Sequence, residues 1–226
     1  MDNSSDDVTA FNQQSPRLSL KGSQKLHESN SLTEYSNWTK KFNIIYINLD
    51  KSLERRERME QQLEEYGLQA ERFSAIHTPF FGILGCGLSH IYALKMAQER
   101  KYQNVLILED DFEFLVSKEL FNHEMTRFFQ EVDNKYDVCC LSYNLKKSED
   151  CQYDFLLRAL DTQSACGYLV NCNYYSKLIR NLTESIYHLI NSNHEHWNYA
   201  NDKFWKVLQT QDKWYCFKTA IGREIN

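Results

Sequence analysis

The pattern of hydrophobic and polar positions changes abruptly at residue 42. Residues 1–41 are rich in Ser, Asn, Gln, Asp and Lys and show neither helical nor strand periodicity. Such a segment cannot bury enough apolar surface to offset the entropy lost on ordering. The pattern therefore predicts a disordered polar tail over residues 1–41 and a single folded domain over residues 42–226.

Within residues 42–226, short apolar runs alternate with amphipathic stretches. The runs at 44–47 and 105–108 are typical of strands buried on both faces, and the apolar stripe over 53–66 indicates a helix. This alternation predicts an α/β fold with a mostly parallel central sheet and flanking helices. The other expected strands cover 71–76, 138–142, two segments between 155 and 170, and 214–217; the other expected helices cover 88–99, 118–132, 174–190 and 200–209.

Composition narrows the class of protein. The chain of 226 residues is 42% apolar and 25% charged, with a net charge of -5 and both signs mixed along its length. A nucleic-acid partner is not expected, because basic residues form no block. No apolar run suits a signal peptide or a membrane span. The seven cysteines form no CxxC pair, so we expect reduced thiols and a cytoplasmic location.

The clearest chemical signal is the acidic triplet Glu109-Asp110-Asp111, which follows the apolar run 105–108 directly. A buried strand cannot hold three like charges, so the acids must lie where the strand emerges, and ligands bind at that end of open α/β sheets. Glu109 and Asp111 project to one side of an extended segment. Together they predict an oxygen site for Mg²⁺ or Mn²⁺. The alternative is a solvated acidic turn.

A second group of polar residues follows the first strand. Asn48 and Asp50 end that strand, and Arg55 follows in the next helix. Amides and carboxylates at a strand end suit a nucleotide, and arginine binds phosphate through a rigid fork. Asp50 and Ser52 are also candidates for capping the helix. The alternative is that Arg55 and Arg56 are surface charges that pair with glutamates of the same helix.

Two further segments offer candidate polar groups. Residues 85–87 predict a glycine-flanked turn into a helix, whose free N–H groups suit a phosphate, with Ser89 and His90 near the ligand. The alternative is a capping Ser89 and a locally packed His90. Asp202 begins an aromatic helix and is a candidate for facing a carbohydrate. His194 and His196 have a poor spacing for a shared metal.

The order of these motifs resembles glycosyltransferase family 25, which includes lipooligosaccharide and procollagen galactosyltransferases. The resemblance covers residues 44–222. Its matching stretches are IYINLD at 45–50 with Arg55, GC at 85–86 with LSH at 88–90, LILEDD at 106–111, GYLV at 167–170, and Asp202 with Trp205.

The resemblance implies a GT-A-like fold, a UDP-sugar donor (often UDP-galactose), a carbohydrate or glycoprotein acceptor and transfer with inversion. It places Glu109 and Asp111 at the metal and Asn48, Asp50, Arg55, Ser89 and Asp110 at the donor. Inversion needs a base that deprotonates the acceptor, for which Asp202 is the first candidate and His90 the second.

One departure favours a second hypothesis. After the last expected strand, the segment 218–226 lacks the proline, glutamine and Ser-Asp pair that family members carry. A catalytically degenerate UDP-sugar-binding module is therefore one alternative, and another nucleotide-dependent transferase is a second. A phosphatase is disfavoured because the sequence contains no phosphate-binding loop.

Overall fold

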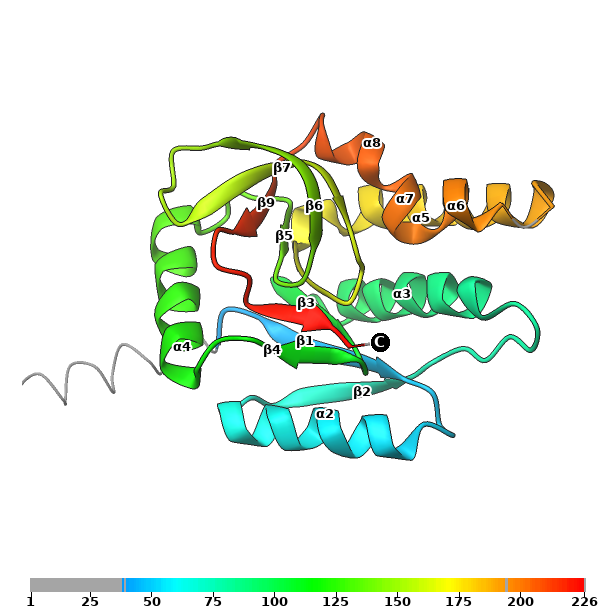
Figure 1. Cartoon of the computed structure of the whole chain (residues 1–226), viewed down its shortest axis with the longest axis horizontal. Coiled ribbons are helices and arrows are strands. Elements are labelled where there is room, and N and C mark those ends of the chain that lie inside the picture. Colours follow the sequence, from blue (N-terminus) through cyan, green and yellow to red (C-terminus); the bar gives the residue numbers. More distant parts are fainter. Residues whose placement is uncertain (1–37, 39, 194, 226) are drawn as a thin grey trace, which may run out of the picture.

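The structure, a computed structural model, describes residues 38, 40–193 and 195–225. In that part, strands and helices alternate over residues 43–109, and a run of strands followed by a run of helices comes later in the chain (Figure 1). In chain order the elements are β1 (Asn43–Asn48), α2 (Leu53–Tyr66), β2 (Ala70–Ser74), α3 (Gly82–Glu99), β3 (Asn104–Glu109), β4 (Phe112–Phe114), α4 (Lys118–Arg127), the π-helical turn η1 (Phe128–Val132), β5 (Val138–Cys140), β6 (Asn144–Asp150), β7 (Leu156–Gln163), β8 (Gly167–Asn171), the 3₁₀ turn η2 (Cys172–Tyr174), α5 (Tyr175–Asn191), α6 (His196–Tyr199), α7 (Asn201–Phe204), α8 (Lys206–Gln209), β9 (Trp214–Phe217) and β10 (Gly222–Glu224).

The main sheet has eight strands in the order β2-β1-β3-β8-β5-β9-β7-β6. β1 is parallel to β2 and β3, and β5 is parallel to β9, whereas β8 and β7 are antiparallel to their neighbours. Six of the eight strands therefore point the same way. The predicted α/β fold with a mostly parallel central sheet and flanking helices is confirmed.

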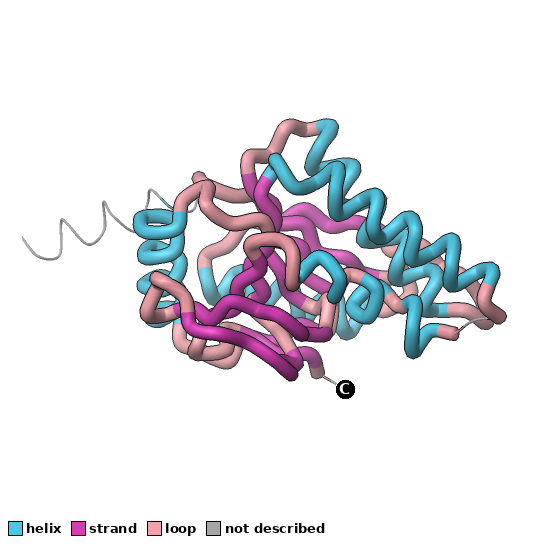
Figure 2. Tube along the Cα trace, turned by 90° about the horizontal axis from the view of Figure 1, so that it is seen from above, coloured by secondary structure: helices cyan, strands magenta, loops and turns pink. Residues whose placement is uncertain are grey.

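Alternate residues of β1 and β3 face two separate hydrophobic cores, as expected for strands covered on both faces. Ile44 and Leu106 belong to the core that contains α2 and α4. Ile45 and Ile107 belong to the core that contains α3 and α5. The helices α3 and α5 lie side by side over their face of the sheet (Figure 2). This double cover explains why the first and third strands read as unbroken apolar runs.

A second, two-stranded sheet joins distant parts of the chain. β10 pairs antiparallel with β4, so that Glu224 lies opposite Phe112. A Cβ on Gly222 would collide with the ring of Phe112, and glycine is therefore required for this close approach. The last strand thus returns to the middle of the molecule, where the end of the chain lies beside β4 (Figure 1).

The predicted turn at residues 85–87 is wrong. These residues lie inside α3, which begins at Gly82 rather than at Leu88. Both glycines serve close packing instead of a turn. A Cβ on Gly85 would meet the backbone oxygen of Ile76, and one on Gly87 would lie 2.5 Å from Ile186.

Two other local predictions also need correction. The expected helix over 200–209 is divided into α7 and α8 on either side of Trp205, which is fully buried and packs edge-on against Tyr168. Ser52 precedes α2 but forms no side-chain cap. Asp50 does not cap it either, because its carboxylate accepts hydrogen bonds from Arg72 and Ser74.

The predicted disordered segment 1–41 lies outside the described residues except for residues 38, 40 and 41. Trp38 is only 4% exposed; it stacks on Phe42 and meets Phe121 edge-on. Across the described ranges, none of the helices combines the length and the apolar character that a membrane span needs.

Candidate active site

The ends of β1 and β3 bring the first two predicted polar groups together. The strands are parallel with Ile47 opposite Glu109, so the next residues, Asn48 and Asp110, meet beyond the sheet. The buried Asn48 donates a 2.7 Å hydrogen bond from Nδ2 to Oδ2 of Asp110. Arg72 on β2 donates in turn to Oδ1 of Asn48 at 2.9 Å. Three neighbouring strand ends therefore orient one carboxylate.

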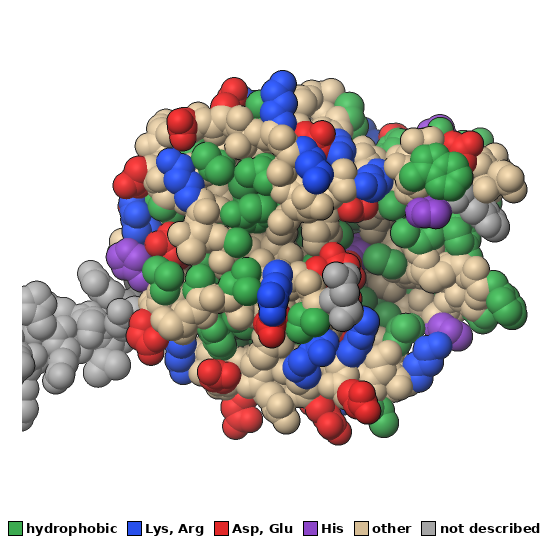
Figure 3. All heavy atoms as spheres, viewed as in Figure 1, with side chains coloured by type: hydrophobic (Ala, Val, Ile, Leu, Met, Phe, Trp, Pro, Cys, Tyr) green, Lys and Arg blue, Asp and Glu red, His purple; other side chains and the backbone are tan. Residues whose placement is uncertain are grey.

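A cleft of about 400 Å³ opens beside these strand ends. The end of β1, the loop after β2, the start of α3 and the end of β3 form its walls. Lys51 and His77 approach each other at its rim, with Nζ and Nε2 3.2 Å apart. The fully exposed Phe80, which has a positive φ of 68°, also lines it. Acidic side chains meet Lys and Arg side chains near the middle of the face in Figure 3. Cations and an aromatic ring thus surround a space that ends at the acids.

Arg55 on α2 bridges two members of the acidic triplet. Its Nη1 lies 3.2 Å from Oδ1 of Asp110 and 3.1 Å from Oδ2 of Asp111. The side chain of Arg55 is 47% exposed, whereas those of the two aspartates are 11% and 13% exposed. Arg56 pairs with Glu60 at 2.9 Å, as the alternative expected. Arg55 pairs instead with the two aspartates among the described residues, so it belongs to the acidic group at the end of β3.

The surroundings of Asp111 disfavour the ionised form of its carboxyl. Burial raises its pKa to about 6, and the negative charge of Glu109 adds to this effect. Hydrogen bonding from the thiol of Cys166, 3.4 Å from Oδ1, and the charge of Arg55 act in the opposite direction. A carboxyl with these surroundings gains from any additional cation that enters the cleft.

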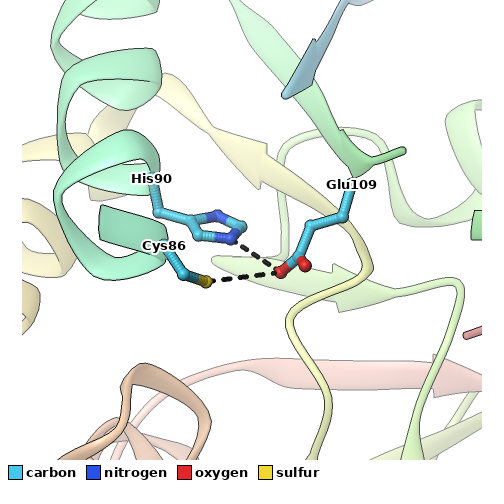
Figure 4. A group of neighbouring side chains, drawn as sticks. All are labelled: Cys86, His90 and Glu109. Carbon is cyan, nitrogen blue, oxygen red and sulfur yellow. Dashed lines mark hydrogen bonds and ion pairs between the residues drawn. The ribbon is translucent and has the colours of Figure 1, made fainter. Parts of the chain in front are cut away.

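Glu109 turns toward α3 and contacts His90 and Cys86 (Figure 4). Its Oε1 lies 2.9 Å from Nε2 of His90 and accepts a 3.9 Å contact from the thiol of Cys86. Burial alone would raise the pKa of Glu109, but the hydrogen bonds from His90 and Cys86 hold it below its usual value. His90 is only 1% exposed, and its Nδ1 lies 2.9 Å from the hydroxyl of Tyr168. His90 is therefore placed to orient Glu109.

Ser89 lies at the cleft but is fully buried. Its hydroxyl donates to the backbone oxygen of Gly85 at 2.6 Å and accepts from the backbone N–H of Ile76 at 2.8 Å. These bonds attach α3 to the loop after β2. Because residue 85 lies inside the helix, the free N–H groups expected of a glycine turn at this point are absent.

Asp50, which was predicted to contact the nucleotide-sugar, bonds to side chains of β2 in the structure. Its carboxylate accepts a 2.6 Å bond from Arg72 and a 2.8 Å bond from the hydroxyl of Ser74. Hydrogen bonding to Arg72 and Ser74 holds the pKa of Asp50 below its usual value. This carboxylate links the ends of β1 and β2.

Asp202 approaches the acidic triplet together with a residue that the sequence reasoning missed, Glu224. Asp202 accepts the backbone N–H of Ser164 at 3.1 Å, and Glu224 accepts the hydroxyl of Ser164 at 3.3 Å. Burial raises the pKa of Glu224, and the charges of Glu109 and Asp202 raise it further. Nothing in the sequence signals Glu224, because only the pairing of β10 with β4 brings it to the acids.

The poor spacing of His194 and His196 for a shared metal stays a prediction. His194 lies outside the described residues. His196 contacts Trp197 with its ring and is exposed. Among the described residues, another group could hold a metal ion: the ligand atoms of Cys86, His90 and Glu109 all lie within 4.8 Å of one another.

Comparisons with known proteins give one relative by sequence and several structures with a similar arrangement. No family model matches the chain. A Drosophila melanogaster protein described as a glycosyltransferase 25 family member is 27% identical, over 60% of this chain. The chain spans only 27% of the length of that relative.

Solved structures that resemble the chain do so distantly. A glycosyltransferase involved in the glycosylation of the major capsid of PBCV-1 is 10% identical, with 78% of this chain and 92% of that chain covered and a TM-score of 0.41. The glycosyltransferase GlyE of Streptococcus pneumoniae TIGR4 is 14% identical, with 85% and 43% covered and a TM-score of 0.41.

The sequence relationship agrees with the motifs found along the chain. The resemblance to glycosyltransferase family 25 is thereby confirmed, and this chain is a distant homologue of a member of that family.

Proposed function

We propose that the chain is a glycosyltransferase that moves a sugar, galactose or glucose, from a UDP-sugar to a hydroxyl of a carbohydrate or hydroxylated protein acceptor. The transfer would be metal-assisted and inverting, and residues 42–226 would form the transferase domain. The relationship to a family 25 member supports the reaction class. The choice of donor, sugar and stereochemistry follows from the family resemblance.

The observation that carries the proposal is the meeting of cations and buried acids at the ends of β1 and β3. A nucleoside diphosphate is an anion with an aromatic base, and the cleft offers partners for both parts. Lys51 and Arg55 line it beside the acids, and Phe80 presents an exposed ring at the same opening. Arginine suits phosphate through its rigid fork, and an aromatic ring can stack on a base.

The acids fit a divalent cation with a preference for oxygen, Mn²⁺ or Mg²⁺. Burial raises the pKa of Asp111 to about 6, and the charge of the neighbouring Glu109 contributes to this rise. Asp111 and Glu109 would hold the ion, and Arg55 would be free to turn from the aspartates to a phosphate. Bound there, the ion would neutralise charge on the departing nucleoside diphosphate. Asp110, fixed by Asn48, would face the donor.

Asp202 is our candidate for the base that takes the acceptor proton. Its Oδ2 is held by the backbone N–H of Ser164, which leaves the second oxygen for the incoming hydroxyl. His90 was the other candidate, but its imidazole is buried and bonded on both nitrogens to Glu109 and Tyr168. We therefore assign His90 to positioning Glu109.

Calorimetric titration of the purified chain with UDP, with and without Mn²⁺, tests the donor site. We expect UDP binding that strengthens at least tenfold with Mn²⁺ and loses this gain in Asp111→Asn. Asp150→Asn is the matched control, because Asp150 lies on the exposed edge strand β6. The proposal fails if UDP does not bind under any metal condition.

Turnover separates an enzyme from a binding module. Wild-type chain should release UDP slowly from a UDP-sugar, and Asp202→Asn should lower this rate about 100-fold, within the usual range for losing a general base. UDP affinity should not change in that variant. Firm Mn²⁺-dependent UDP binding without release from any of a panel of UDP-sugars, with or without acceptors, would favour the degenerate binding module instead.

A further inference from the structure

The group formed by Cys86, His90 and Glu109 has a different chemical character from the acids that follow it. It combines one sulfur, one imidazole nitrogen and one carboxylate oxygen, from α3 and the end of β3 (Figure 4). Cys86 and His90 are four residues apart on one helix, so their side chains lie on the same face. Glu109 approaches that face from the neighbouring strand.

We propose that Cys86, His90 and Glu109 form a binding site for a soft or borderline divalent cation such as Zn²⁺. Thiolate and imidazole ligands select such ions, whereas Mg²⁺ and Mn²⁺ prefer oxygen. This site shares Glu109 with the oxygen site assigned to Glu109 and Asp111, but its other two ligands are a sulfur and an imidazole nitrogen. It does not depend on the proposed transferase activity.

The distances fit a tetrahedral ion after small side-chain movements. Metal bonds of roughly 2.0–2.3 Å place the ligand atoms of a tetrahedral site roughly 3.3–3.7 Å apart. Here Nε2 of His90 is 2.9 Å from Oε1 of Glu109, and Sγ of Cys86 is 3.9 Å from the same oxygen. An ion entering between them would separate the first pair and draw in the sulfur, so rotation about side-chain bonds is sufficient.

Tyr168 supplies the supporting contact that metal-binding histidines usually have. Its buried hydroxyl lies 2.9 Å from Nδ1 of His90. For Nε2 to bind an ion, the imidazole proton must be on Nδ1, where the oxygen of Tyr168 can accept it. Such a partner fixes the ring orientation and the tautomer. Binding also releases the proton of the Cys86 thiol, because the thiolate is the form that binds a metal ion.

An ion can reach this site and complete its coordination from the cleft. All three ligand residues line the 400 Å³ cleft, although His90 itself is only 1% exposed. Three protein ligands with a fourth position open to water is the arrangement of zinc sites that are accessible to small molecules. We therefore expect reversible exchange with ions in solution.

Cobalt spectroscopy tests the site without reference to catalysis. Titrating Co²⁺ into the full chain should give one equivalent of tetrahedral visible bands together with a near-ultraviolet thiolate-to-cobalt band, and Zn²⁺ should abolish both. In Cys86→Ser the thiolate band should disappear and affinity should fall at least tenfold. Tyr168→Phe should keep the band and weaken affinity 10–100-fold, as losses of supporting contacts usually do.

Cys172→Ser is the matched control, since Cys172 is also a partly exposed free cysteine but lies outside the cluster. This variant should bind Co²⁺ like the wild type, and circular dichroism should show that every variant is folded. A wild-type spectrum without a thiolate band would overturn the proposal. So would a band that persists in Cys86→Ser or is lost in Cys172→Ser.

Discussion

Replacing Asp111 by asparagine should make the protein more stable while damaging its proposed site. Asp111 is almost buried, and burial together with Glu109 raises its pKa from 3.8 to about 6. An asparagine of the same shape can still accept the thiol hydrogen bond of Cys166 and carries no charge to bury. The lost contact with the half-exposed Arg55 should cost no more than about 1 kcal/mol.

The size of the gain follows from the pKa. A rise from 3.8 to about 6 corresponds to an upper limit of about 3 kcal/mol at about 1.4 kcal/mol per pKa unit. Solvent screens part of this destabilisation, because the side chain is 13% exposed. Allowing also for the lost Arg55 contact, we expect the variant to be more stable by about 1–2 kcal/mol at pH 8. For a domain of this length that is a rise in Tm of roughly 2–8 °C.

The gain should depend on pH in a defined direction. Below about pH 4, Asp111 is protonated in both the folded and the unfolded chain, so it contributes nothing. Between about pH 4 and pH 6 the unfolded chain ionises first, and the wild type loses stability relative to the variant. Above about pH 7 the difference should be constant.

Urea unfolding of both proteins from pH 4 to pH 8 without divalent ions measures this difference, with Asp150→Asn as the control variant. The reasoning would be refuted if the difference in unfolding free energy between the two proteins did not change with pH. It would also be refuted if the variant became less stable than the wild type as the pH rises to 8. With saturating Mn²⁺, the wild type but not Asp111→Asn should gain thermal stability, because the ion binds only the folded state.

Three further predictions concern other parts of the chain. Gly222→Ala should lower the free energy of unfolding by about 1–3 kcal/mol, because its Cβ would overlap the ring of Phe112; urea titration measures this loss, and an unchanged midpoint would contradict it. Phe80→Ala should leave Tm unchanged, since the ring is fully exposed, but should weaken UDP about tenfold while leaving pyrophosphate binding unaffected; equal losses for both ligands would exclude stacking on the base. Ser117→Ala should lower stability by about 1 kcal/mol, because the Ser117 hydroxyl caps α4 by accepting the N–H of Leu120; thermal unfolding against Ser117→Asp, which keeps the cap, checks it.

The sequence was informative where one local pattern decides the structure. The apolar runs at 44–47 and 105–108 became β1 and β3 because each strand is covered on both faces, which leaves a signal that neighbouring residues cannot mask. Strand β6, by contrast, was missed because it is an exposed edge strand of mostly polar residues, with little to distinguish it from a loop. The three-residue strands β4 and β10 were missed for a different reason, because they pair only with each other and lie far apart in the sequence.

Glycine was the main source of error near the candidate site. In sequence, Gly85 and Gly87 predict a turn, because glycine is tolerant of unusual backbone angles. In the structure they serve close contacts of α3 with the loop after β2 and with α5. A single sequence does not distinguish these two uses of glycine, because the distinction depends on what packs against the residue.

The residues of the candidate site at the ends of β1 and β3 could be predicted from the sequence, whereas those that come from later strands could not. Asn48, Arg55 and Asp110 meet because parallel strands end at the same edge of a sheet, and this rule applies to the sequence directly. The roles of these residues stay predictions. Cys166 and Glu224 were not found, because Cys166 directly precedes β8 and Glu224 ends β10, and the long-range pairing of these strands follows from no local pattern.

Because β10 pairs with β4, residues 224 and 225 lie beside the acidic triplet. The backbone N–H of Ile225 bonds to the oxygen of Asp111, and Glu224 adds a charge that its neighbours repel. A short strand that carries a repelled carboxylate is the kind of segment that detaches locally while the rest of a protein stays folded. A cation among the acids would reduce the repulsion that acts on Glu224, so that metal loading would also favour the pairing of β10 with β4.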